Sequence, residues 1–183
     1  MRYLQQGGFQ NNPHMRLTLG LSLVLLAGFW VSNVALYFAH MNLDPASVVA
    51  YYRGDEARFM APRSAESMLE VTHMHLPMFA LVLLLLTHLV LFAPMRSATK
   101  TALIVASFGS AVLMEAAGWL TRFAHPGFGW LKVIAFVAFQ AVLGVLIAGL
   151  SAYLVRGHRR PRRLRAPQEA SVELRKARRG ARP

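Results

Sequence analysis

The chain has 183 residues, of which 55% are hydrophobic and only 15% are charged, and its 20 Lys and Arg outnumber its 8 Asp and Glu. Soluble domains usually carry about 25% charged residues, so the composition argues against a soluble domain. There is no Cys, which excludes a disulfide framework, a zinc–thiolate site, an iron–sulfur cluster and covalently attached c-type haem.

Four apolar stretches are long enough to cross a bilayer, because a membrane helix needs about 20 mostly apolar residues. The predicted spans are residues 17–39, 71–93, 101–121 and 130–155, and a loop at 41–70 joins the first two. We therefore predict an all-α integral membrane protein whose four-helix bundle covers residues 17–155. Residues 1–16 are predicted to be an unstructured cytoplasmic segment.

The Lys and Arg residues indicate how this bundle is oriented. Fifteen of the 20 lie in the N-terminal segment, in the connection between the second and third spans, and after the fourth span. These three segments share one side of a four-span protein, and by the positive-inside rule that side is cytoplasmic. Both ends of the chain are therefore predicted to be cytoplasmic. The loop at 41–70 then faces the periplasm of a multi-pass protein in the bacterial inner (cytoplasmic) membrane.

The segment at 156–183 is the most basic part of the chain, with eleven Lys and Arg. We predict a disordered basic tail. Directly after a membrane span, such a tail is typical of topology fixation and of attraction to anionic lipids. Basic runs also occur in nucleic-acid binding, but the position beside the membrane favours lipid, and no nucleic-acid partner is expected.

The histidines are the main indication of function. His40, His73, His75 and His125 are predicted at the outer ends of the spans. Ionisable groups at membrane depth are costly, so they suggest a functional site. Helical spacing places His73 on a stripe with small and polar residues. We therefore predict that His73 points into the bundle and that His75 points away from it or along its rim.

Two charged residues of the third span extend this candidate site. Glu115 and Arg122 are two helical turns apart on one stripe, and they are predicted to approach each other near the outer end. The chain has no nucleophile–base motif and no phosphate-binding loop, so neither hydrolysis nor group transfer is supported. Four helices without an inverted repeat also give little support for transport by this chain alone.

With His40 and His73 on successive spans, the bundle resembles the four-helix membrane b-type cytochromes. The resemblance covers residues 17–155 and rests on architecture and histidine placement. It implies one haem b near the outer face, ligated by His40 and His73, with His75 and His125 as substitutes.

By the same resemblance, the chain is an electron-transfer subunit of an oxidoreductase that relays electrons from quinol to a periplasmic redox partner. Glu115, with Arg122 beside it, would accept a proton from the quinol or tune the haem. The expected partners are a c-type cytochrome or other membrane subunits, and the acidic loop at 41–70 would dock a basic carrier.

Three alternatives remain open at the level of sequence. The first alternative is a cofactor-free structural or assembly subunit of a membrane complex. A copper site is a second alternative, because thioether and imidazole ligands select copper and several methionines lie in the outer half: Met41, Met60, Met68, Met74, Met78 and Met114. A di-iron site is less favoured, because Glu70 and His73 supply only half of the required ligand pattern.

Overall fold

The computed structural model describes residues 12–158, which form helices joined by short connections. Four long helices within this range have the length and composition of membrane spans. They are α1 (Pro13–His40), α3 (Ala65–Leu91), α4 (Ser97–Trp119) and α5 (Gly129–His158). The prediction of an all-α membrane bundle with four spans is therefore confirmed.

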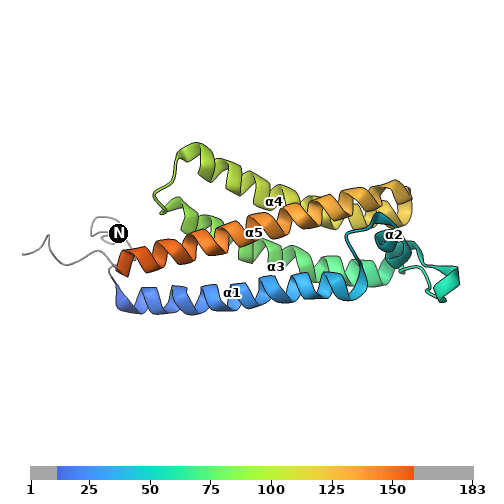
Figure 1. Ribbon diagram of the computed structural model, residues 1–183, viewed down its shortest axis with the longest axis horizontal. Coiled ribbons are helices and arrows are strands. Elements are labelled where there is room, and N and C mark those ends of the chain that lie inside the picture. The colour runs from blue at the N-terminus through green and yellow to red at the C-terminus, as the bar shows by residue number, and fades with distance from the viewer. Residues whose placement is uncertain (1–11, 159–183) are drawn as a thin grey trace, which may run out of the picture.

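The helices run alternately up and down and leave the short elements together at one end of the bundle (Figure 1). We call this end the loop end. It holds α2 (Pro45–Arg53), the 3₁₀ turn η3 (Glu56–Arg58), the π-helical turn η4 (Leu120–Ala124) and the 3₁₀ turn η5 (Pro126–Phe128). The opposite end, where α1 begins and α5 ends, is the terminal end.

The first helix begins at Pro13, earlier than the predicted residue 17. The Asn12 side chain accepts hydrogen bonds from the backbone N–H groups of His14 and Met15, at 3.0 and 3.3 Å. An Asn cap followed by proline is a favourable start for a helix, because proline lacks the N–H that would go unbonded there. The prediction that residues 1–16 are unstructured is therefore wrong from residue 13 onward.

The second long helix also begins early, at Ala65 and not at the predicted residue 71. The Ser64 side chain caps the helix by accepting from the Ser67 backbone N–H at 3.1 Å. The negative charge of Glu66 in the first turn also stabilises the helix by interacting favourably with the helix dipole. His73 and His75 therefore lie eight and ten residues inside α3, about 12 and 15 Å from its start. They do not begin the helix, as the sequence had suggested.

The other predicted boundaries agree more closely with the structure. The loop predicted at 41–70 contains α2 and the first turn of α3. Helix α4 begins four residues before the predicted residue 101, and α5 covers the predicted span at 130–155. The basic tail predicted at 156–183 is helical through His158, and residues 159–183 lie outside the described part of the chain.

The core lies between α3, α4 and α5, and its largest fully buried side chains come from α3 and α5: Phe139, Leu83, Leu86, Leu143 and Leu146. Helix α1 buries only Leu23 and Tyr37. It is held to α5 by a stack of Tyr37 on Phe136 and by a hydrogen bond of 3.0 Å from Trp30 Nε1 to the carbonyl of Gln140. Most of the apolar surface of α1 is therefore left for lipid.

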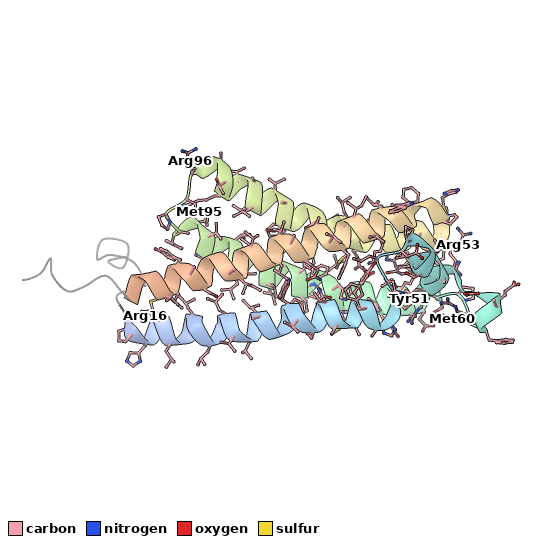
Figure 2. All side chains as sticks on the ribbon, in the orientation of Figure 1. Arg16, Tyr51, Arg53, Met60, Met95 and Arg96 are labelled. Atoms are coloured by element: carbon pink, nitrogen blue, oxygen red, sulfur yellow. The ribbon has the colours of Figure 1, made fainter. Side chains whose placement is uncertain are left out.

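Charged side chains gather at the ends of the bundle, as a membrane requires. Figure 2 shows Arg16 and Arg96 at the terminal end and Arg53 at the loop end. The described chain also begins and ends at the terminal end (Figure 1). The two ends of the described chain, residues 12 and 158, thus lie on one side, whereas the assignment of that side to the cytoplasm remains a prediction.

Candidate functional site

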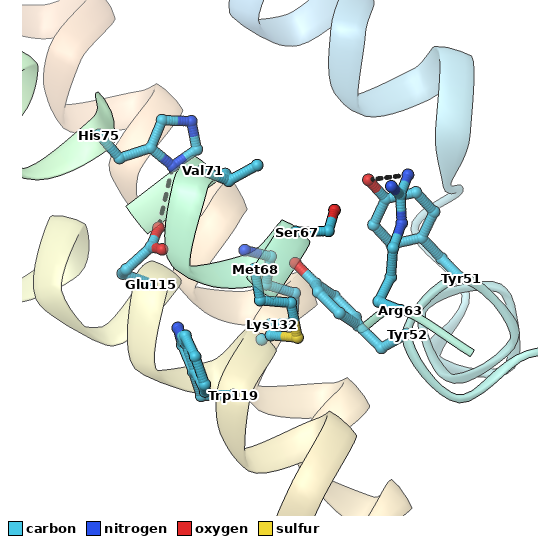
Figure 3. A pocket seen from close by; sticks show the side chains of 11 residues that line it. Tyr51, Tyr52, Arg63, Ser67, Met68, Val71, His75, Glu115, Trp119 and Lys132 are labelled. Carbon is cyan, nitrogen blue, oxygen red and sulfur yellow. Dashed lines mark hydrogen bonds and ion pairs between the residues drawn. The ribbon is translucent and has the colours of Figure 1, made fainter. Parts of the chain in front are cut away.

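Polar side chains from five segments meet at the loop end, around a cavity of about 50 Å³ (Figure 3). A buried water needs at least about 10–15 Å³ of cavity volume, counted as the space open to a water-sized sphere, so this cavity has room for about three waters. We call the following side chains the polar cluster: Tyr51, Tyr52, Arg63, Thr72, His75, Glu115, Trp119 and Lys132.

Glu115 on α4 is the centre of the polar cluster. One carboxylate oxygen accepts a hydrogen bond from the Thr72 hydroxyl, and the other lies 2.9 Å from Nδ1 of His75. Thr72 in turn accepts from Trp119 Nε1 at 2.9 Å. The Glu115 side chain is 13% exposed and that of His75 is 40% exposed. Because the carboxylate orients the imidazole through Nδ1, Nε2 is directed away from Glu115.

A buried cation lies beside this carboxylate. Lys132 on α5 is 7% exposed, and its Nζ donates to the carbonyl of Met114 at 2.7 Å. Lys132 and Glu115 line the same cavity and attract each other electrostatically, although their side chains do not form a direct ion pair. Taking an unpaired charge out of water costs several kcal/mol. The two charges therefore compensate each other inside the apolar bundle.

Tyr52 closes the cavity on the side of α2. Its ring packs against Gly118, where an added Cβ would lie only 2.8 Å from the phenol oxygen, so a glycine is required for this contact. Burial raises the pKa of the Tyr52 phenol, and the nearby Glu115 carboxylate raises that pKa further. Tyr52 is therefore a neutral hydrogen-bonding group at physiological pH.

Arg63 occupies the mouth of the cavity. Its Nη2 donates to the Tyr51 hydroxyl at 2.7 Å, and its guanidinium lies 4.4 Å from the centre of the Tyr51 ring. Burial raises the pKa of the Tyr51 phenol, and Arg63 opposes that rise. Tyr51, Arg63 and Ser67 also line an open cleft of about 710 Å³. These three side chains thus form the wall between the cavity and the cleft.

The predicted orientations of His73 and His75 are wrong. His75 faces Glu115, whereas His73 is exposed and makes no hydrogen bond, ion pair or ring contact with the described residues. The face of α3 that packs against the bundle carries Met68, His75, Phe79 and Leu86. Most of these side chains are large and apolar, whereas the prediction assumed a face of small and polar residues. Large apolar side chains fill the helix contacts here, so small residues did not mark the inward face.

The predicted approach of Arg122 to Glu115 is also wrong. Arg122 Nε donates to the carbonyl of Arg63 at 2.8 Å, and Glu115 instead pairs with His75. Seven residues separate Glu115 from Arg122, which would place both on one face of a regular α-helix. The wider π-helical turn from Leu120 changes this phase before Arg122 is reached. Arg122 consequently fixes the backbone at the mouth of the cavity.

The other predicted ligands, His40 and His125, make no contact with Glu115 or His75. His40 ends α1, is exposed, and has its ring 5.5 Å from that of Tyr51. His125 Nδ1 accepts from the Gly127 backbone N–H at 3.0 Å, so it caps the turn η5. Within residues 12–158, no three His, Cys, Asp or Glu side chains are grouped so as to hold a metal ion.

The described residues therefore do not fit a haem within a single chain. Of the predicted ligand pair, His73 is exposed on α3 without a partner among the described residues and His40 lines the open cleft, and the cavity beside His75 has a volume of only about 50 Å³. The ligand assignment stays a prediction that this geometry does not favour.

The methionines of the copper hypothesis are also dispersed. Met41 and Met60 line a pocket of about 180 Å³ together with His40. Met68 and Met114 are buried, whereas Met74 and Met78 are exposed on the surface of α3. The methionines therefore do not gather around one of the predicted histidines.

Several members of the polar cluster were missed from the sequence. Lys132 was assigned to the outer flank, although it and Glu115 are the only formal charges within the predicted third and fourth spans. Since a charge in an apolar span needs a partner, these two residues might have been paired on that ground. Thr72, Tyr52 and Arg63 gave no comparable signal, because their positions depend on how α2 and α3 pack.

A comparison with protein families shows that residues 42–162 match a family described as a transmembrane helical domain, Aq_1264_TM. The match covers more than half of the chain. The chain belongs to this family. No curated protein and no solved structure matched it.

The matched range bears on the candidate site. Every residue of the polar cluster, from Tyr51 to Lys132, lies within the family's domain. Helix α1 and its last residue, His40, lie before the match. The polar cluster is thus built by the family domain alone, whereas a site that used His40 would need a helix outside it.

Proposed function

We propose that this chain is the membrane subunit of a quinol-oxidising complex, and that the polar cluster binds the quinol headgroup and takes its proton. The observation that supports this is the Glu115–His75 pair, which lies within the apolar spans. The imidazole is 40% exposed, so a ligand dissolved in the membrane can reach it. A carboxylate-oriented imidazole is a suitable general base for a hydroxyl group.

The chemistry of the polar cluster favours a quinol over other lipid-soluble ligands. With Nδ1 donating to Glu115, Nε2 of His75 is an acceptor for a phenolic hydroxyl. Trp119 and Tyr52 supply aromatic surface and hydrogen-bonding groups beside it. A quinol headgroup is a planar ring with two hydroxyl groups, so it suits both features.

Oxidation of a quinol to a quinone releases two protons and two electrons, which need separate destinations. Each proton passes in turn to the His75–Glu115 pair and from there past Tyr51, Arg63 and Ser67, which line both the cavity and the open cleft, to water. The electrons pass to a redox centre of a partner subunit. No step of this proposal requires a haem within the chain.

The deciding experiment measures binding of decylubiquinol to the purified protein by fluorescence quenching, with His75→Gln compared against His73→Gln. The two histidines are neighbours on α3, but only His75 contacts Glu115. Losing a hydrogen bond to a charged or strongly polar partner costs about 1.5–3 kcal/mol. His75→Gln should therefore weaken binding about tenfold or more, and His73→Gln should leave it unchanged.

Equal effects of the two substitutions, or no binding by the folded wild type, would contradict the proposal. The cofactor-free structural subunit would then be the better account. Glu115 is not the first choice for substitution, because its loss would leave Lys132 buried without its counter-charge.

The haem prediction has an independent test. A reduced-minus-oxidised optical spectrum of the purified chain would show a b-type absorption band at near-stoichiometric haem if the chain binds haem. If that band were present and were lost in His40→Ala or His73→Ala, the original ligand assignment would stand. A spectrum without the band from folded protein would remove haem and leave the quinol proposal intact.

A further inference from the structure

The open cleft at the loop end is a second site, which adjoins the polar cluster and shares Tyr51 and Arg63 with it. Its volume is about 710 Å³, and it lies between the end of α1 and the start of α3. Its lining includes hydrogen-bond donors from His40, Tyr51, Arg63, Ser64 and Ser67, and it includes no Asp or Glu. The chemistry of this lining selects an anion.

Arg63 is the charge that would hold such an anion. No carboxylate among the described residues lies within ion-pair distance of its guanidinium, whereas the nearby Arg58 is paired with Asp55 at 3.4 Å. One nitrogen of Arg63 donates to Tyr51, which leaves the other N–H groups available. A guanidinium binds the oxygens of a phosphate in a two-pronged geometry.

The hydroxyl groups around Arg63 are also free to donate. Tyr51 accepts from Arg63, and Ser64 accepts from the Ser67 backbone N–H, so each hydroxyl hydrogen remains available. Glu66 is exposed in the first turn of α3, and it does not line the cleft. The cleft therefore presents one unpaired cation and several donors without a competing carboxylate.

The position of the cleft identifies the source of the phosphate. It lies where two membrane spans end, which is the level of the lipid headgroups. Part of its lining is apolar, from Ala39, Met60, Ala61 and Pro62, and this suits the glycerol and acyl portion of a lipid. We propose that the cleft binds the phosphate of a phospholipid headgroup, with Arg63 as its principal ligand.

The proposal can be tested by native mass spectrometry of the delipidated protein with added phosphatidylglycerol, with Arg63→Gln compared against Arg53→Gln. Arg53 is an exposed arginine at the end of α2 and does not line the cleft. Both variants lose one positive charge from the loop end. Arg63→Gln should weaken binding of the first lipid at least fivefold, whereas Arg53→Gln should leave it close to wild type.

A further variant separates lipid binding from the structural role of Arg63. Arg63→Lys removes the two-pronged guanidinium and its bond to Tyr51 but keeps a positive charge in the cleft, so it should retain more of the lipid binding than Arg63→Gln. If Arg63→Lys weakened binding as much as Arg63→Gln, the positive charge would not hold the lipid, and the proposal would fail.

Inorganic phosphate distinguishes the two sources of the ligand. Titration of the detergent-solubilised protein with phosphate should give binding much weaker than that of the lipid. Equal, Arg63-dependent binding of free phosphate would overturn the lipid assignment, and lipid binding that is equal in Arg63→Gln and Arg53→Gln would overturn the site. Neither outcome depends on whether the polar cluster binds quinol.

Discussion

Glu115 and Lys132 are single charged residues in otherwise apolar helices, and both line the cavity of the polar cluster. Lys132 reaches the carbonyl of Met114, and Glu115 accepts from Thr72 and pairs with His75. Removing one member of a buried pair typically costs about 3–5 kcal/mol, because the other charge is left uncompensated. The same groups that suit proton exchange therefore also hold α3, α4 and α5 together at the loop end.

A different buried polar group gives a prediction about stability. Gln140 on α5 is 7% exposed, and neither its Nε2 nor its Oε1 has a partner among the described residues. Leaving a buried polar group unbonded costs about 1–3 kcal/mol. Gln140→Met, which keeps the volume and removes the amide, should therefore raise the unfolding temperature of the protein in detergent.

The control for this prediction is Gln140→Asn, which keeps an amide and leaves a gap in the packing. It should lower the unfolding temperature, since unfilled core volume is destabilising. A fall in the unfolding temperature with Gln140→Met would instead mean that the amide is bonded in the membrane.

At the scale of elements, the position of α4 against α2 depends on a single glycine. An added Cβ at Gly118 would lie 2.8 Å from the Tyr52 hydroxyl, whereas one at Gly109 would meet nothing within 4 Å. Both glycines lie in α4, where alanine is intrinsically favoured over glycine by about 0.5–1 kcal/mol. Gly109→Ala should therefore stabilise the protein slightly, and Gly118→Ala should destabilise it.

The two substitutions can be compared by thermal unfolding in detergent. A double variant identifies the cause, because Tyr52→Phe removes the oxygen that Gly118→Ala would crowd. The cost of Gly118→Ala should be smaller in the Tyr52→Phe protein than in the wild type. An unchanged cost would show that Tyr52 is not the residue that limits this position.

The π-helical turn η4 is the element that separates Arg122 from Glu115. Because it ends α4, it directs Arg122 to the carbonyl of Arg63 and so ties α4 to the segment that precedes α3. The backbone of Arg63 is held by two hydrogen bonds. Its N–H donates to the carbonyl of Tyr52, and its carbonyl accepts from Nε of Arg122. These two bonds position the guanidinium at the boundary between the cavity and the open cleft.

At the scale of the whole molecule, the orientation of the bundle in the membrane can be tested directly. The chain contains no Cys, so single cysteines can be introduced without first removing others. Phe59 at the loop end is 97% exposed, and Ser97 is exposed at the start of α4, at the terminal end.

If the termini are cytoplasmic, a membrane-impermeant thiol reagent added to intact cells should label Phe59→Cys and should leave Ser97→Cys unlabelled until the cells are permeabilised. The opposite pattern would reverse the predicted orientation. Labelling of neither cysteine before permeabilisation would show that both positions are shielded from the outside, contrary to a periplasmic loop end.

The sequence by itself determined the fold class, the number of spans and the side shared by the two termini. These features follow from the length of apolar stretches and from the distribution of Lys and Arg, which are local sums along the chain. An error of a few residues in a helix boundary does not change the fold class, the number of spans or the predicted sides of the membrane. The early helix starts at Pro13 and Ala65 therefore did not affect these predictions.

Only the tertiary structure decided which side chains meet. His75 and not His73 faces Glu115, Lys132 joins them from α5, and Arg122 turns away after the π-helical turn. Each outcome depends on helical phase, which changes by about 100° with every residue, and on which helices are neighbours. Hydropathy reports how much of a helix is apolar, but the contact between two polar groups depends on packing over the whole bundle.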